Sequence, residues 1–234
     1  MRKVGLWLLI TLAVGALGYA VFVAAEWSWF GKGKPAPPPA RAVISMDRFL
    51  PQYDLSERHE TPVKAPAPVT YAAAREVDIQ RSPLVRAVFQ SRKILFRSQG
   101  QEMARRPFLE QVRGMGWGLL AEVPGRALVF GAVTRPWEPT VRFHPLPPAQ
   151  FAAFRRPGWA KIVWTLEVDP AGAERSVFRT QTRVATTDAA ARSRFRQYWA
   201  AVSPGILLIR QQALGLVRGD AERRTRAATA RPAG

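Results

Sequence analysis

Residues 179–199, RTQTRVATTDAAARSRFRQYW, contain a strand that runs directly into a long helix. Side chains alternate over 175–184, which predicts a strand with one buried face. Thr187 or Asp188 is placed to cap a helix that we expect to reach Arg218. Apolar residues recur along that helix at steps of three or four and predict one buried stripe: Ala191, Phe195, Tyr198, Val202, Ile206, Ile209, Ala213 and Leu216 or Val217. Pro204 lies inside it and predicts a kink or a short break.

Upstream of this stretch the pattern is mixed. Residues 57–64 are typical of a strand, and the prolines at 66 and 68 open a helix. A second short helix begins at Ser82-Pro83. Two hairpins are expected, one over 115–123 and 126–133 and the other over 159–168 and 175–184, each closed by a turn that contains proline and glycine. A further strand over 140–144 and a brief helix over 147–154 are also expected, and 92–112 is ambiguous.

Two stretches resemble the START-like superfamily, also called the SRPBCC or helix-grip fold. VKAPAPVTYAAAREVD (63–78) is similar to the start of such proteins, and 179–199 is similar to the closing strand and helix of a bacterial branch. The resemblance covers about residues 57–218. It implies an α+β fold in which a curved antiparallel sheet wraps around a long C-terminal helix and holds an apolar ligand between them. The superfamily has no shared catalytic motif, so the resemblance assigns no functional residue.

Strand alternation selects the side chains that would line such a cavity. The apolar face of each strand is expected to turn inward, although over 126–133 Ala127, Val129 and Val133 would serve as well as Leu128 and Phe130. A filled core without a cavity is the competing interpretation. The candidate ligand-binding residues are Trp117, Leu119, Phe130, Trp164, Phe178, Thr180, Thr182 and Tyr198. The two threonines would be the polar groups inside.

An uncharged run, VGLWLLITLAVGALGYAVFVAA (4–25), follows Arg2 and Lys3. As a helix it spans roughly 33 Å, enough to cross a hydrocarbon core of about 30 Å. We therefore expect residues 1–30 to be a single-pass transmembrane anchor with an aromatic belt at Trp27, Trp29 and Phe30. A cleaved signal peptide is the alternative, but the run exceeds the usual signal core. The short basic head favours an extracytoplasmic domain.

The composition of the chain after residue 30 changes from one segment to the next and indicates three parts. Residues 31–45 are proline-rich and typical of an extended linker. Residues 46–218 are expected to form the domain that resembles the START-like superfamily, and 219–234 are expected to be a basic, disordered tail. The net charge is +18, which favours contact with anionic membrane lipids or a merely solvated basic surface. No dense basic run marks nucleic acid as a partner.

Catalytic patterns are scarce. The chain has no cysteine and two histidines, His59 and His144, without metal-ligand spacing, so no metal, cofactor or catalytic residue is assigned. Both histidines are expected to be solvated. Glu122 is the one carboxylate that could serve a cavity enzyme, with a rim ion pair to Arg126 or Arg135 as the simpler interpretation. The sequence thus favours an anchored domain that binds an apolar small molecule, with a tethered protein-interaction module or a cavity enzyme of the cyclase or hydrolase type as alternatives.

Overall fold

The computed structural model describes residues 2–30, 43–95 and 107–230. Within these ranges one antiparallel sheet has the strand order β1-β6-β5-β3-β2, and β4 pairs with β3. The strands are β1 (Leu55–Val63), β2 (Gly118–Val123), β3 (Ala127–Thr134), β4 (Phe143–His144), β5 (Ala160–Pro170) and β6 (Ser176–Thr186). The two expected hairpins are confirmed as the pairs β2–β3 and β5–β6.

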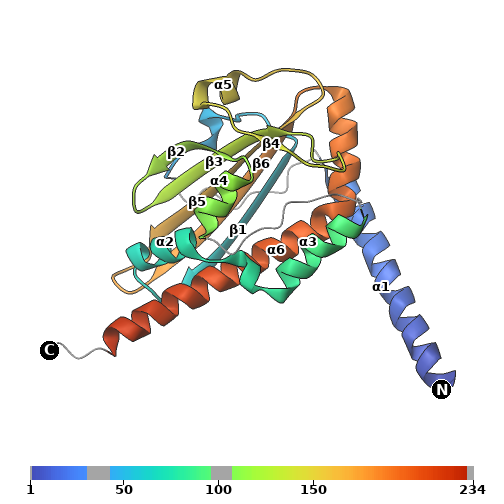
Figure 1. Cartoon of the computed structure of the whole chain (residues 1–234), viewed down its shortest axis with the longest axis horizontal. Helices are drawn as coiled ribbons and strands as arrows, with labels where there is room; N and C mark the ends of the chain where they lie inside the picture. The colour runs from blue at the N-terminus through green and yellow to red at the C-terminus, as the bar shows by residue number, and fades with distance from the viewer. Residues whose placement is uncertain (1, 31–42, 96–106, 231–234) are drawn as a thin grey trace.

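Helices cover the sheet on both faces (Figure 1). They are α1 (Arg2–Trp29), α2 (Ala67–Glu76), α3 (Pro83–Leu95), α4 (Phe108–Gly114), α5 (Pro148–Ala153) and α6 (Ala189–Thr229), with short 3-10 turns at Met46–Arg48 and Ile79–Arg81. Helices α2 and α6 pack on one face, which we call the inner face, and α5 packs on the other face together with residues 43–50. The expected α+β helix-grip arrangement, an antiparallel sheet against a long C-terminal helix, is confirmed.

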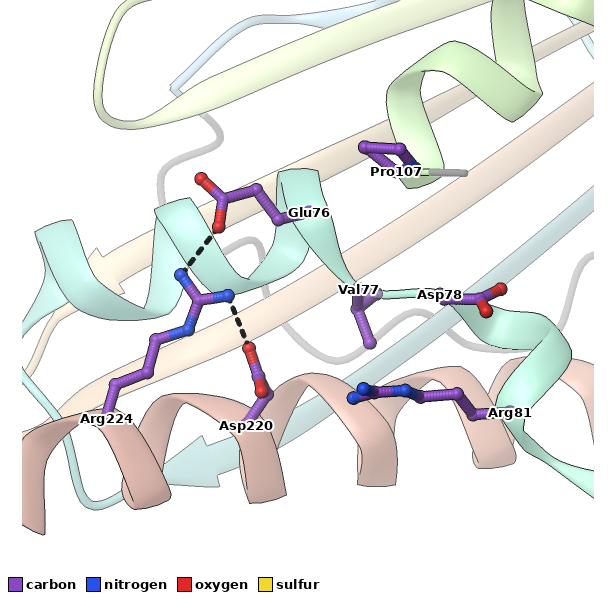
Figure 2. A pocket seen from close by; sticks show the side chains of 7 residues that line it. All are labelled: Glu76, Val77, Asp78, Arg81, Pro107, Asp220 and Arg224. Atoms are coloured by element: carbon purple, nitrogen blue, oxygen red, sulfur yellow. Dashed lines mark hydrogen bonds and ion pairs between the residues drawn. The ribbon is translucent and has the colours of Figure 1, made fainter. Parts of the chain in front are cut away.

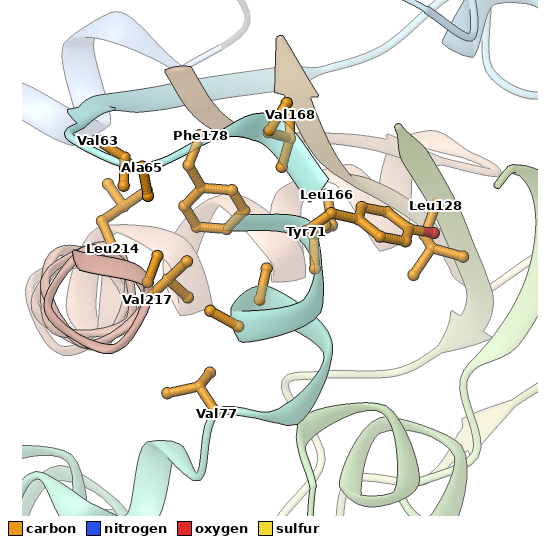
Figure 3. Close-up of a cluster of buried hydrophobic side chains, with 14 of the residues drawn as sticks. Val63, Ala65, Tyr71, Val77, Leu128, Leu166, Val168, Phe178, Leu214 and Val217 are labelled. Atoms are coloured by element: carbon orange, nitrogen blue, oxygen red, sulfur yellow. The ribbon is translucent and has the colours of Figure 1, made fainter. Parts of the chain in front are cut away.

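The largest buried cluster lies between the inner face, α2 and the C-terminal half of α6 (Figure 3). Phe178 is at its centre and is contacted from the helix side by Leu214 and Val217. A second buried cluster on the same face joins Ala160 and Val184 to Phe195 and Trp199 of α6. Each cluster removes a continuous apolar surface from water, which is the main term that holds the helix on the sheet.

Helix α6 begins as predicted, because the side chain of Asp188 accepts a hydrogen bond of 2.8 Å from the backbone N–H of Ala191. Pro204 does not break the helix, but α6 changes direction between its orange and red parts in Figure 1. The buried stripe agrees with the predicted one at Ala191, Phe195 and Val217 and lies one position later in between, and the predicted Ile206 and Ile209 are only half-buried. Its members are Ala191, Phe195, Trp199, Ser203, Leu214, Val217 and Ala221, whereas Tyr198, Val202 and Ala213 are half-buried. The sequence pattern selected the apolar side chains and therefore missed Ser203.

The C-terminal tail also differs from expectation. Helix α6 continues past Gly219 to Thr229 instead of ending in a disordered segment. Ala221 is completely buried, and Arg224 lies 2.7 Å from carboxylate oxygens of both Glu76 and Asp220. These contacts with α2, added to the high helix propensity of alanine and arginine, explain why the helix extends.

The C-terminal part of α1 packs on the first half of α6. The Tyr19 hydroxyl donates a 2.6 Å hydrogen bond to the carbonyl of Ala201, and Trp199 Nε1 donates to the buried carboxylate of Glu26 at 2.9 Å. The Arg196 guanidinium lies 4.1 Å from the centre of the Trp27 ring. The apolar N-terminal helix is therefore held at a defined place on the domain.

Several smaller expectations meet the structure only in part. The strand expected over 140–144 is reduced to Phe143 and His144. The ambiguous region 92–112 contributes the end of α3 and the start of α4, and residues 96–106 lie outside the described residues. Of the predicted linker over 31–45, residues 31–42 lie outside the described residues. Ile44, near the C-terminal end of that linker, is buried on the face of the sheet that α5 covers.

Candidate functional site

One row of side chains crosses the inner face of the sheet from edge to edge. Strand pairing places Glu57 opposite Thr182, Thr182 opposite Trp164, Trp164 opposite Phe130, and Phe130 opposite Leu119. Directly paired residues of antiparallel strands point to the same face. The row is therefore polar at β1 and β6 and becomes aromatic and aliphatic toward β3 and β2. Four of the eight predicted site residues belong to it.

The apolar end of the row is a group of contacting rings. Trp164 stacks on Phe130 with ring centres 4.8 Å apart and meets the edge of Trp117 at 6.0 Å. Trp117 stacks on Phe143 at 4.6 Å, and Phe108 of α4 lies 5.8 Å from Trp164. Phe130 is fully buried, whereas the two tryptophans keep part of their surface exposed. Such half-covered rings provide a large apolar contact surface.

The polar end of the row lies under the middle of α6. Glu57 is 5 % exposed and Thr182 is 7 % exposed, and Ser203 of α6 is completely buried. Arg210 lies two helical turns after Ser203, on the same stripe. Burial lowers the pKa of Arg210 to about 10, and the carboxylate of Glu57 opposes that shift. A band of polar groups thus separates the two apolar clusters that α6 makes with the sheet.

His59 differs from its predicted solvated state. It lies on the edge strand β1, as expected, but it pairs with Thr180 and shares the inner face with Glu57. The side chain of His59 is 20 % exposed, and its Nε2 lies 3.7 Å from a carboxylate oxygen of Glu57. Strand alternation itself places residues 57, 59 and 63 on one face, and the burial of Val63 identifies that face as the inner one.

The other predicted site residues also lie on this side of the sheet. Thr180 is next to the row, Phe178 is in the cluster of Figure 3, and Tyr198 lies on α6 with its ring centre 6.0 Å from that of Phe195. Phe178 and Phe130 are core side chains in the described structure. The partly accessible members are Trp117, Leu119, Trp164, Thr180 and Tyr198.

Glu122 lies at the rim, but not with the expected partners. A bulge between Leu119 and Ala121 shifts the strand by one residue and turns Glu122 to the inner face, opposite Leu128. Its carboxylate accepts a 3.3 Å hydrogen bond from the Tyr71 hydroxyl and lies 3.8 Å from Arg75. The predicted pairing with Arg126 or Arg135 is wrong, because Arg126 binds Asp169 and Arg135 binds Glu138.

A groove of about 490 Å³ opens elsewhere, between the end of α2, the start of α4 and the C-terminal part of α6. Figure 2 shows Arg224 bridging Glu76 and Asp220 across it. Its lining is mostly charged: Glu76 and Asp220 are paired with Arg224, and Asp78 accepts hydrogen bonds from the Gln80 backbone N–H and the Gln111 side chain. We interpret it as an ion-paired seam between helices. Among the described residues, no group of three or more histidine, aspartate or glutamate side chains is placed to hold a metal ion.

Comparison with known proteins gives fold-level likeness only. No family model and no curated protein matches the chain. A hypothetical protein from Helicobacter pylori has 10 % identity and a TM-score of 0.38, over 80 % of this chain and 99 % of that one. The Zhui aromatase/cyclase from Streptomyces sp. R1128 has 17 % identity and a TM-score of 0.27, over 74 % and 97 % of the two chains. The di-domain aromatase/cyclase BexL of the BE-7585A biosynthetic pathway has 12 % identity and a TM-score of 0.28, over 72 % and 46 %. At these scores no ligand or residue role is transferred.

Proposed function

We propose that this protein is a membrane-anchored START-like domain that binds an apolar molecule, a lipid, between the sheet and α6. The observation that supports this is the row from Glu57 to Leu119, which is polar at one end and aromatic at the other. Ligand sites commonly combine a mostly apolar lining with a few convergent polar groups. A core built only for stability has no need of a polar band between two apolar clusters.

The N-terminal helix supports the membrane part of the proposal. Helix α1 is long and apolar enough to cross a bilayer, and so is α6, which packs on the sheet. Leu6, Trp7, Leu9 and Leu17 of α1 are each more than half exposed. In a bilayer these side chains would meet acyl chains instead of water. Because Tyr19 and Glu26 bind Ala201 and Trp199, the anchor would hold the first half of α6 beside the membrane, where a lipid could exchange.

The first test is native mass spectrometry of the full chain released from detergent, followed by organic extraction. A co-purifying apolar mass supports the proposal. Thr182→Phe places a larger side chain between the sheet and α6, so the co-purifying mass should be lost. Thr140→Phe changes an exposed site and should retain that mass. A clean apo mass that also ignores added lipids would refute lipid binding and favour the tethered interaction module.

The side of the membrane can be tested separately. We propose an extracytoplasmic domain, because the short basic head before residue 4 favours the cytoplasm. The chain has no cysteine, so one cysteine introduced at exposed Thr140 is a unique reporter. Labelling of intact cells by a membrane-impermeant maleimide supports this orientation. Labelling only after lysis refutes it and leaves the ligand proposal unaffected.

A further inference from the structure

Two polar side chains interrupt the buried stripe of α6. Ser203 and Arg210 occupy the positions between Trp199 and Leu214 that would otherwise be apolar. Ser203 Oγ and Arg210 Nη1 are both enclosed and have no hydrogen-bond partner within the described parts of the chain. An enclosed donor without a partner is costly, and such groups in native proteins are usually satisfied by another protein group, an ordered water or a bound ligand.

The surroundings of Arg210 compensate its charge only in part. The carboxylate of Glu57 attracts the guanidinium, yet burial outweighs that attraction and lowers the pKa of Arg210 to about 10. The titratable or polar groups that face this part of α6 from the strands are Glu57, His59, Thr180 and Thr182. A further oxygen acceptor at the enclosed Nη1 would therefore stabilise the Arg210 cation.

We propose that Arg210 and Ser203 bind the carboxylate head of a single-chain amphiphile whose apolar body lies along Trp164 and Trp117. The inference rests on the proposed function and specifies its ligand class. Helical side chains lean toward the N-terminus, so the Arg210 side chain extends toward Ser203, about 10 Å away along the axis. A guanidinium fork matches the two oxygens of a carboxylate, and the Ser203 hydroxyl can donate to the same group.

Glu57 narrows the choice of head group. Its carboxylate lies at the polar end of the row, where it attracts Arg210 and would repel a second anion. At the same distances a dianionic phosphate doubles both the repulsion by Glu57 and the attraction to Arg210, but it leaves two net negative charges at this site where a carboxylate leaves one, and enclosed net charge is costly. A monoanion that Arg210 can neutralise is therefore favoured over a phosphate monoester.

The test uses the full chain in phosphatidylcholine nanodiscs and two photoreactive probes, 10-azistearic acid and its methyl ester. Cross-linked peptides are identified by mass spectrometry, which separates labelling of the sheet and α6 from labelling of α1 by probe dissolved in the bilayer. We expect the acid to label residues 160–186 and 203–214 at least tenfold more than the ester. Only the acid has a carboxylate that can accept charge-assisted hydrogen bonds from Arg210. Arg210→Gln should remove this preference and retain labelling by the ester.

Arg218→Gln is the matched control, because Arg218 lies on the same helix with its side chain 54 % exposed, and it should leave the preference unchanged. If Arg210→Gln fails to fold, Ser203→Ala provides the second variant and should lower the preference several-fold. Equal labelling by acid and ester in the unaltered protein would overturn the head-group proposal while ligand binding stands. Labelling confined to α1 by both probes would overturn the proposed function itself.

Discussion

Replacing Ser203 with alanine should make the ligand-free protein more stable. Ser203 is completely buried, and its hydroxyl has no partner among the residues that the structure describes. Burying an unsatisfied hydroxyl costs about 1–3 kcal/mol, and alanine removes that cost without leaving a large cavity. The higher helix propensity of alanine adds roughly 0.5 kcal/mol. Most substitutions in a core destabilise, so the sign of this effect is diagnostic.

Bound lipid is first extracted from the full chain in detergent. Thermal unfolding is then monitored by near-ultraviolet circular dichroism. For a domain of this size each kcal/mol raises Tm by about 2–4 °C, so Ser203→Ala should raise it by roughly 3–14 °C. Ser91→Ala is the control. Ser91 lies in α3 and is exposed, so it should gain only the propensity term.

Two results would contradict the reasoning. A Tm that falls would mean that the hydroxyl is satisfied in the free protein, for example by a buried water, and that Ser203 stabilises the core. A rise equal to that of Ser91→Ala would mean that the hydroxyl bears no burial cost. If the reasoning is correct, the advantage of Ser203→Ala should shrink when the ligand is present, because the hydroxyl then has a partner.

Three further predictions concern the scaffold. Leu214→Ala should lower the free energy of unfolding in urea by about 2–5 kcal/mol, and exposed Gln211→Ala should change it little. Burial lowers the pKa of Lys161 to about 8, so the folded state binds fewer protons than the unfolded chain between about pH 8 and 10.5. The free energy of unfolding should therefore rise over that pH range. In Lys161→Met this rise should be absent. Gly116→Ala should lower Tm more than Gly172→Ala does. Both glycines have positive φ, but only at Gly116 would a Cβ meet a backbone carbonyl of β4. Equal decreases in Tm would exclude that clash.

Local chemistry in the sequence determined most of the elements. The alternation over β6, the cap at Asp188 and the apolar periodicity of α6 were sufficient for the closing strand and helix. The Pro-Gly turn and the flanking apolar runs were sufficient for the β2–β3 hairpin. These features depend on neighbours within a few residues, so their physics is visible in the chain itself. The faces of Trp164, Thr180 and Thr182 followed for the same reason, whereas β3 is apolar on both faces and its sequence left the face of Phe130 open.

Only the tertiary structure decided which side chains meet. Strand order and register bring Glu57, Thr182 and Trp164 into one row from segments that are far apart in the chain. A single bulge turned Glu122 to the inner face, and docking on α2 extended α6 to Thr229. Ser203 and Arg210 are polar residues that each follow a predicted member of the apolar stripe, Val202 and Ile209, by one position. Their burial follows from the rotation of α6 on the sheet, which total apolar burial sets and no local pattern reports.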